Sequence, residues 1–174
     1  MASLAQLDQF YHSPPEVSST IGRFMVTDVE FYNIGVETKE IDTGLRAGIK
    51  LQFTGELAPQ IEEAVARIAE LEKREAGWDS HGGRSLNDRA VHPAFRLIVD
   101  GFKMCRHPRI KLNGDGDLDL IWESESRYLE VTARADGEYD VSYEDSDTGE
   151  EFESETPIPY ASAQDYLKRF CSVA

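Results

Sequence analysis

Apolar residues recur at helical spacing in two neighbouring stretches of the chain. The first stretch, residues 57–75, carries one apolar stripe formed by Leu57, Ile61, Ala64, Val65, Ile68 and Leu71. Charged residues occupy the opposite side, so the pattern predicts an amphipathic helix that ends at Gly77. A second helix is expected to begin near Asn87, a residue type that suits a helix N-cap. Pro93 inside this second helix should kink it or delay its start.

After Pro108 the spacing of the apolar residues changes from helical to alternating. Alternation over short runs bounded by turn residues is typical of β-strands. The predicted strands are 109–113, 117–123, 127–134 and 138–144, with a further one near 151–155. Turn residues follow at Gly114-Asp115-Gly116, Ala135-Asp136-Gly137 and Asp147-Thr148-Gly149. A closing helix is expected over residues 162–172, with its apolar residues on one side.

Two further runs rich in β-forming residues precede the helices. Residues 23–33 alternate apolar and polar positions, and Ile49 to Phe53 form the second run. We expect these two strands to pair as an N-terminal β unit over residues 22–55. Residues 1–21 mix small and polar side chains around a Ser-Pro-Pro run, so they are expected to form a flexible N-terminus.

The order of these elements predicts an α+β fold. Two helices and a C-terminal helix would pack on one face of an antiparallel β-meander, with the N-terminal β unit as a hairpin-like extension. The chain would then comprise the flexible residues 1–21, the β unit 22–55 and an α+β domain over 56–174. Its 174 residues are enough for one such core and a small extension.

Successive side chains of a strand point to opposite faces, so parity sorts the residues of the meander into two sets. One set is apolar and is expected to face the helices: Leu118, Leu120, Trp122, Leu129, Val131, Ala133, Tyr139, Val141, Tyr143 and Phe152. The other set contains ten carboxylates, which we call the acidic face: Asp117, Asp119, Glu123, Glu130, Glu138, Asp140, Glu144, Glu151, Glu153 and Glu155. Neighbouring strands are about 4.8 Å apart, so like charges would repel one another across this face.

The negative charge of the chain is concentrated in the same segment. Residues 115–156 hold 16 of the 33 acidic residues and only two bases, Arg127 and Arg134, within a net charge of −15. Two interpretations stay open. The acidic face could be a solvated surface that favours solubility and prevents edge aggregation. It could instead dock on a basic surface of another protein, including one that normally holds nucleic acid.

Residues 84–111 have the opposite balance, with seven bases and two acids. A basic helix can simply neutralise the acidic residues beside it. The alternative is head-to-tail self-association of an electrically dipolar molecule, which would make the protein a homo-oligomer.

The composition of the chain indicates which kinds of partner and which cellular compartment to expect. Such acidity disfavours direct binding to nucleic acid or to an anionic membrane, because both need a basic surface. No apolar run approaches the ~20 residues of a membrane span, and the N-terminus lacks a basic-then-apolar signal pattern. The two cysteines, Cys105 and Cys171, are too few and too far apart for a disulfide framework, so we expect a cytoplasmic protein.

Three candidate sites can be considered for chemistry. The run from Asn113 to Asp119 resembles a calcium loop, but Leu118 and Ser124 occupy the places where an EF-hand needs Gly and Glu. The histidines and cysteines match no zinc spacing. Asp79 and His81 could form an acid–base couple, although no nucleophile or oxyanion donor is marked beside them. We therefore expect no metal, no cofactor and no catalytic residue.

The run Gly77-Trp78-Asp79 has a structural explanation. Gly77 can adopt a left-handed cap, Trp78 can anchor the turn in the core, and the Asp79 carboxylate can accept hydrogen bonds from backbone amides. A Gly-Gly pair at 82–83 then allows a tight reversal. The run is interpreted as an interhelical turn that helps to determine the fold.

Several ordered pieces of residues 57–172 resemble a group of small bacterial and phage proteins without an established activity. The pieces are Gly77-Trp78-Asp79, Gly82-Gly83, Asn113 to Gly116, Leu120 to Glu123, Arg127 to Val131, Asp136-Gly137 and Thr148 to Glu151. The resemblance implies a helix, a Gly-rich turn, a second helix, a meander and a final helix. The segment 22–55 lies outside it.

Binding is favoured over catalysis by these features. The leading hypothesis is a non-enzymatic module whose acidic face binds a basic protein surface as a nucleic-acid mimic. The phage-like resemblance suggests an inhibitor of the anti-CRISPR or anti-restriction kind. One alternative is an antitoxin or immunity-type partner that binds through an apolar patch or residues 1–21. Another is a small hydrolase or transferase that uses Asp79 and His81.

Overall fold

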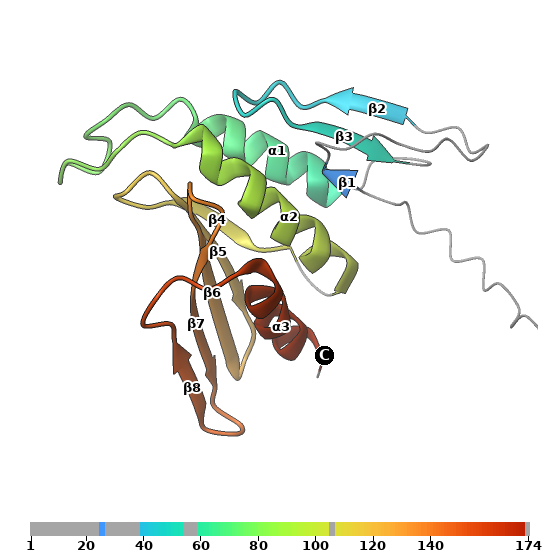
Figure 1. Cartoon of the computed structure of the whole chain (residues 1–174), viewed down its shortest axis with the longest axis vertical. Helices are drawn as coiled ribbons and strands as arrows, with labels where there is room; N and C mark the ends of the chain where they lie inside the picture. Colours follow the sequence, from blue (N-terminus) through green and yellow to red (C-terminus); the bar gives the residue numbers. More distant parts are fainter. Residues whose placement is uncertain (1–24, 27–38, 54–58, 105–106, 173–174) are drawn as a thin grey trace, which may run out of the picture.

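The computed structural model describes residues 25–26, 39–53, 59–104 and 107–172 (Figure 1). The elements in chain order are β1 (Met25–Val26), β2 (Lys39–Asp42), β3 (Lys50–Phe53), α1 (Pro59–Leu71), α2 (Asp88–Met104), β4 (Arg109–Leu112), β5 (Leu118–Glu123), β6 (Arg127–Ala133), β7 (Tyr139–Asp145), β8 (Glu150–Glu153) and α3 (Tyr160–Cys171). This order confirms the predicted α+β fold with its C-terminal helix. The predicted flexible segment 1–21 lies outside the described residues.

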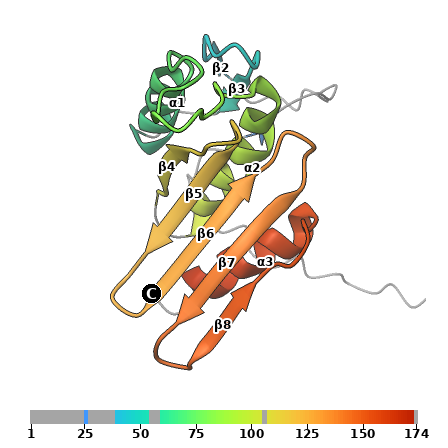
Figure 2. The ribbon, with the colours of Figure 1, turned by 90° about the vertical axis from the view of Figure 1, so that its left-hand side faces the viewer.

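Strands β4 to β8 form one antiparallel sheet whose spatial order follows the sequence (Figure 2). Leu120 pairs with Val131, and Val131 pairs with Val141, so residues of equal parity lie side by side across the strands. Buried and more exposed positions alternate along β4, β6 and β7. The meander and its two unlike faces are therefore confirmed. Ile121 is the exception, because it has outward parity and is nevertheless buried.

Helices α2 and α3 pack on the apolar face of this sheet, and α1 packs against α2 and β4 (Figure 1). Helix α2 lies close to β5 at Gly101, where a Cβ atom would lie 3.1 Å from Cζ2 of the buried Trp122.

Helix α2 begins after Asn87. The Asn87 side-chain oxygen accepts the amide hydrogen of Arg89 and its backbone carbonyl accepts that of Ala90, as expected of an N-cap. The prediction that Pro93 delays the helix start is wrong, because α2 already begins at Asp88. Pro93 lies within the helix, and its carbonyl accepts the Tyr139 hydroxyl.

A second, three-stranded sheet lies on the other side of α1 and α2, with the order β1-β3-β2 (Figure 1). The predicted pairing of the two N-terminal strands is confirmed for Met25 and Val26, because β1 and β3 are antiparallel neighbours. The rest of the predicted first strand lies outside the described residues. Strand β2 was not predicted. It is an edge strand with one apolar residue, Ile41, and all four of its residues are exposed, so it carries no alternating pattern. Leu45, Ile49 and Leu51 from this unit belong to the same apolar core as the helices.

The hairpin turn between β4 and β5 is fastened to the segment that leads into α2. The amide of Arg84 donates to the Gly114 carbonyl at 2.9 Å, and the amide of Asn87 donates to the Gly116 carbonyl at 2.9 Å. Gly116 has a φ of +90°, and a Cβ atom there would lie 2.6 Å from the Ser85 carbonyl oxygen. Only glycine satisfies both the backbone conformation and the contact.

A buried ion pair joins β6 to the end of β7. Arg127 and Asp145 are directly opposed in the sheet, and Nε of Arg127 lies 2.9 Å from Oδ2 of Asp145. Asp145 also accepts the amides of Asp147 and Thr148 in the β7–β8 turn. The guanidinium of Arg127 reaches the Phe170 carbonyl in the last turn of α3. One pair therefore connects two strands, a turn and a helix end.

Helix α3 closes the described part of the chain. It buries Ala163, Leu167 and Phe170, and its Tyr166 ring stacks on Phe152 of β8 at 4.5 Å. Cys171, its last residue, is disulfide-bonded, which the low cysteine count did not lead us to expect. The other cysteine of the chain, Cys105, lies outside the described residues. None of the helices in the described ranges is both long and apolar enough to cross a membrane.

Gly116→Ala should destabilise the protein more than Gly137→Ala does. Both glycines have nearly the same positive φ, but a Cβ atom at Gly137 would meet nothing within 4 Å. Gly137→Ala should therefore cost about 1 kcal/mol of strain, whereas Gly116→Ala adds a backbone clash and should cost about 3 kcal/mol. Urea unfolding followed by circular dichroism measures both. Equal losses would show that the contact with Ser85 does not constrain the hairpin.

Arg127→Ala should lower the melting temperature by on the order of 10 °C, because it leaves the Asp145 carboxylate buried without its counter-ion. Arg169→Ala is the matched control, since it breaks the exposed pair with Glu150, whose atoms are 2.7 Å apart. Exposed pairs contribute little, so a change of about 2 °C or less is expected for the control. Differential scanning calorimetry measures the melting temperatures of both variants. A similar small change in both would contradict the role given to Arg127.

Candidate protein-binding face

Seven of the ten carboxylates of the acidic face lie in strands, on the side of the meander opposite the helices. Asp119 and Glu123 are in β5, Glu130 is in β6, Asp140 and Glu144 are in β7, and Glu151 and Glu153 are in β8. Asp117, Glu138 and Glu155 lie next to the ends of these strands. The structure thus brings the predicted residues together on one sheet, although it does not leave all of them equally available.

Asp117 and Asp119 hold the sheet together and are partly buried. Asp117 accepts the amide of Ala135 at 3.1 Å. Asp119 accepts the Thr132 hydroxyl at 2.8 Å and the Asn113 side-chain amide at 3.1 Å. Burial raises the pKa of both carboxyls, against the opposing effect of these hydrogen bonds. Both carboxylates therefore act mainly as internal hydrogen-bond acceptors.

Glu130 and Asp140 also have partners on the sheet. Glu130 accepts the hydroxyl of Tyr128, two residues earlier on β6. Asp140 pairs with Arg134 at 3.0 Å, and the same guanidinium contacts Asp136 at 3.2 Å. The hydrogen bonds that Arg134 donates to Asp136 and Asp140 raise the pKa of its guanidinium. These contacts neutralise part of the central acidic face.

Five carboxylates remain exposed and have no hydrogen-bond or ion-pair partner among the described residues: Glu138, Glu144, Glu151, Glu153 and Glu155. Glu123 also has no close partner, because its contact with Arg109 is long, at 3.9 Å, and both side chains are more than half exposed. The uncompensated negative charge is therefore displaced towards β7 and the edge strand β8, at the far side of the sheet from β4 (Figure 2).

The strand register reduces the repulsion that the parity pattern alone predicts. Across the strands, Asp119 is opposite Lys111 and Thr132, and Glu130 is opposite Ile121 and Ser142. Tyr128 lies between Glu123 and Glu144 in the same way. Within the acidic face, only Glu144 and Glu151 are directly opposed carboxylates. The expectation of general repulsion across the face is therefore wrong for the centre of the sheet and correct at its β8 edge.

The non-acidic residues of this face were not identified from the sequence as part of the site. Tyr128 and Thr132 on β6, and Arg134 directly after it, have outward parity, and each contacts a carboxylate of the face. Their parity was available in the sequence. The contacts of Thr132 and Arg134 were not, because a cross-strand contact depends on which residues of two strands are opposed, and that of Tyr128 depends on the direction its side chain takes along β6.

The Gly77-Trp78-Asp79 run forms the predicted turn, but Gly77 does not cap the first helix as predicted, because α1 ends at Leu71. Gly77 has a φ of +83°, and Trp78 packs partly buried against the core while its Nε1 donates to the Arg84 carbonyl at 3.0 Å. The Asp79 carboxylate accepts the amides of Gly83 at 2.8 Å and His81 at 2.9 Å. The Gly83 and His81 amides lower the pKa of Asp79, in that order of size.

The alternative acid–base couple of Asp79 and His81 is not favoured by this geometry. The imidazole Nδ1 of His81 lies 2.7 Å from the backbone carbonyl of Asp79, while the carboxylate is bonded to amides. A Cβ atom at Gly83 would lie 2.7 Å from the carboxylate, which shows how closely the turn encloses it. Asp79 therefore acts as a turn residue in this structure.

The run from Asn113 to Asp119 forms a hairpin turn. The Asn113 side-chain oxygen accepts the amides of Asp115 and Asp117, each at 3.0 Å. Its nitrogen donates to Asp119, so the polar groups of the run bind one another. Within the described ranges, no group of three or more His, Cys, Asp or Glu side chains is placed to hold a metal ion.

Comparison of the chain with protein-family models, with curated proteins and with solved structures gave no match. The geometry of the acidic face is therefore the main guide to function.

Asp79→Leu should lower the melting temperature by on the order of 5 °C, because two amides of the turn lose their acceptor. Asp79→Asn keeps an acceptor oxygen and should lie closer to the wild type, and the exposed His81→Ala should change little. The hydrogen bonds hold the pKa of Asp79 below its ordinary value. Its contribution to stability is therefore present above about pH 4 and is lost as the pH falls below it.

Melting curves between pH 3 and 7, a range chosen to span the ordinary aspartate pKa of about 4, test this account. Asp79→Asn should lose part of the acid sensitivity of the wild type. An unchanged pH dependence would show that the carboxylate does not stabilise the turn.

Proposed function

We propose that this protein is a non-enzymatic binding module whose acidic face docks on a basic surface of another protein. The observation that carries the proposal is the set of exposed carboxylates without partners on β7, β8 and their ends: Glu138, Glu144, Glu151, Glu153 and Glu155. The centre of the same face is internally neutralised, so its outer part is the region that gains most from a cationic partner.

The arrangement at the β8 edge is unfavourable for the isolated protein. Glu144 and Glu151 are directly opposed, and like charges in that position destabilise a sheet. Acidic residues on an edge strand do prevent pairing with other strands, which is the simpler explanation of their presence. A basic partner would both relieve the repulsion and cover the edge. If the residues only protect the edge, no partner should depend on them. Mutation of the carboxylates followed by a binding measurement therefore separates docking from edge protection.

The spacing of these carboxylates supports a nucleic-acid mimic. Outward side chains on one strand repeat every ~6.7 Å, and neighbouring strands are ~4.8 Å apart. Such a surface offers a dense array of negative charges on a rigid support, as a phosphate backbone does. The inferred target is a protein complex that normally binds nucleic acid, and the inferred action is to block it. Together with the resemblance to small phage proteins, this supports an inhibitor of the anti-CRISPR or anti-restriction kind.

The two alternatives have less support. An antitoxin or immunity-type partner would use an apolar patch or residues 1–21, and the only large apolar side chain that is exposed in the described ranges is Ile41. A hydrolase or transferase would need Asp79 and His81 to act together, whereas the Asp79 carboxylate is bonded to turn amides.

A cytoplasmic location is part of the proposal, since complexes that process nucleic acid act there. The disulfide at Cys171 is uncommon in that compartment. A thiol assay on protein purified from its own cells therefore bears on the location independently of the binding partner.

The partner is best isolated by affinity purification from the source organism at low and at high salt. Binding through the acidic face should weaken steeply as salt rises, because it is electrostatic. The same partner should also be displaced by the nucleic acid that it normally binds.

Charge reversal on β8 should then weaken binding to the isolated partner by roughly a hundredfold. The variant is Glu151→Lys with Glu153→Lys, which leaves the internally bonded Asp119 and Asp140 intact. The matched control is Glu62→Lys with Glu75→Lys, which makes the same change in net charge at exposed positions away from the meander. Isothermal titration calorimetry measures both. Equal affinities for the two variants would refute binding through the acidic face and leave the solvated-surface explanation.

A further inference from the structure

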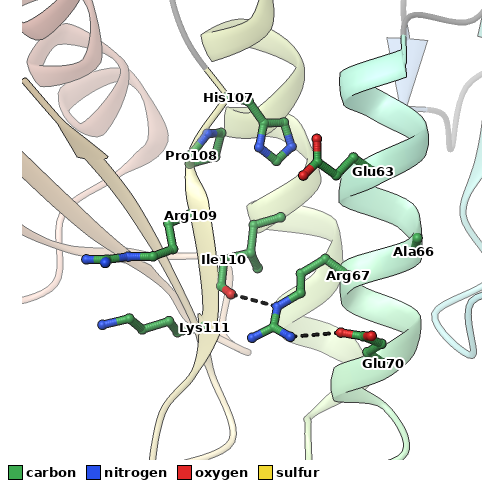
Figure 3. Close-up of a pocket in the computed structure, with 9 residues that line it drawn as sticks. All are labelled: Glu63, Ala66, Arg67, Glu70, His107, Pro108, Arg109, Ile110 and Lys111. Atoms are coloured by element: carbon green, nitrogen blue, oxygen red, sulfur yellow. Dashed lines mark hydrogen bonds and ion pairs between the residues drawn. The ribbon is translucent and has the colours of Figure 1, made fainter.

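A cleft with the opposite electrical character lies between α1 and the edge strand β4 (Figure 3). Its volume is about 500 Å³. Its α1 wall contains Glu63, Ala66, Arg67 and Glu70, and its β4 wall runs from His107 to Lys111. The cleft is at the opposite edge of the sheet from β8 and its exposed carboxylates, although Arg109 and Lys111 border the acidic face at Glu123 and Asp119.

The backbone of β4 is open towards this cleft. One side of β4 pairs with β5, and no strand pairs with its other side in the described structure. Nε of Arg67 donates to the Ile110 carbonyl at 3.1 Å, which shows that the polar groups of Ile110 point into the cleft (Figure 3). Because these groups alternate along an antiparallel strand, those of Leu112 point the same way. The strand therefore presents the amides and carbonyls of two residues to an incoming chain.

Cations line the outer side of this edge. Arg109 and Lys111 are exposed, and their side chains point away from α1 over the outer face of the sheet (Figure 3). Arg67 lies across the cleft and is shared between the Ile110 carbonyl and Glu70, which it contacts at 2.8 Å. Glu63 is the remaining acid of the cleft, and it points towards His107. An added strand would thus have cationic neighbours on its outward side.

The cleft also contains a polar atom that lacks a partner. Nε2 of His107 is buried and makes no hydrogen bond within the described structure. Because this atom has almost no accessible surface, an occupant of the cleft would have to turn the imidazole outwards before bonding to it.

We propose that this cleft binds an extended acidic peptide segment of a partner protein, which pairs with β4 as an additional strand. Strand addition to an open edge is a common mode of peptide recognition, in which main-chain hydrogen bonds give affinity and alternate side chains give specificity. Outward side chains of the peptide would lie beside Arg109 and Lys111 and should be acidic. Inward ones would meet Ala66 and should be small and apolar.

The bound peptide would replace an existing contact. Its amide would donate to the Ile110 carbonyl in place of Arg67, and the guanidinium would keep its contact with Glu70. This inference does not depend on the function proposed for the acidic face, because it concerns another edge of the sheet and a ligand of the opposite charge preference.

The probe is a blocked five-residue peptide of sequence Glu-Val-Glu-Val-Glu, titrated into the ¹⁵N-labelled full-length protein. The Ile110 and Leu112 amides should shift and their hydrogen exchange should slow, because they gain partners. The peptide with N-methylated valines cannot donate the strand hydrogen bonds and should not bind. The peptide Lys-Val-Lys-Val-Lys should bind at least roughly tenfold more weakly.

Variants test the same geometry from the protein side. Lys111→Glu should weaken binding of the acidic peptide roughly tenfold, and Ala66→Arg should abolish it by filling the cleft. Their controls are Lys168→Glu and Ala161→Arg, which make the same changes at exposed positions of α3 and should leave binding unchanged. All four substituted side chains are exposed, so folding should be retained, and the ¹⁵N spectrum confirms it.

Three results would overturn the proposal. The first is the absence of shifts at Ile110 and Leu112 with the acidic peptide at millimolar concentration. The second is equal binding of the N-methylated peptide, which would indicate an ordinary anion site. The third is a concentration-dependent dimer of the free protein that Lys111→Glu abolishes, which would assign the cleft to the acidic β8 edge of a second copy.

Discussion

The pairing of Arg127 with Asp145 constrains the register on which the rest of the meander depends. A buried ion pair contributes little net stability, because desolvation of the two charges offsets most of their attraction. Its effect is on specificity. A slip of one residue between β6 and β7 would separate the pair and turn one strand over relative to the other, so that a slipped β7 would carry Glu144 to the helix side. The pair therefore favours the register in which the inward residues of both strands share one apolar core.

One sheet thus carries two edges of unlike charge. Strand β8 at one edge has Glu151 and Glu153 outward, and β4 at the other has Arg109 and Lys111 outward. Each edge is protected in a different way against pairing with strands of other molecules. Strand β8 is protected by the negative charge of its side chains, and β4 is protected by Arg67, which donates a hydrogen bond to the Ile110 carbonyl. The two proposed partners, a basic protein surface and an acidic extended segment, correspond to these edges of unlike charge.

The acidic face is less uniform than its composition implies. Asp117, Asp119, Glu130 and Asp140 are bonded within the sheet, and Arg134 and Tyr128 lie among them. The uncompensated charge is therefore a narrower region along β7 and β8. This matters for any mutational study, since substitutions at Asp119 or Asp140 change the stability of the sheet together with its charge. Substitutions at Glu151 and Glu153 break no hydrogen bond or ion pair within the described structure, although a change at Glu151 also removes its repulsion with Glu144.

The sequence by itself determined the helices, the five meander strands and the division of the meander into an apolar and an acidic face. It could do so because periodicity within one element is a local property, set by backbone geometry and by the burial of apolar side chains. It also predicted the turn at Asp79, since an aspartate after Gly-Trp can bond its own neighbouring amides.

Only the tertiary structure decided which charges are free. Asp145 has inward parity on β7, and Arg127 has inward parity on β6, so a buried charge pair could have been suspected. The opposition of the two side chains, like that of Asp119 and Thr132, follows from the strand register. Strand β2 could not be predicted either, because an edge strand can form through backbone pairing alone and needs no alternating pattern of side chains. The cleft between α1 and β4 could not be predicted because it depends on how these two elements are placed relative to each other. Contacts between elements depend on the packing of the whole core, which no single segment encodes.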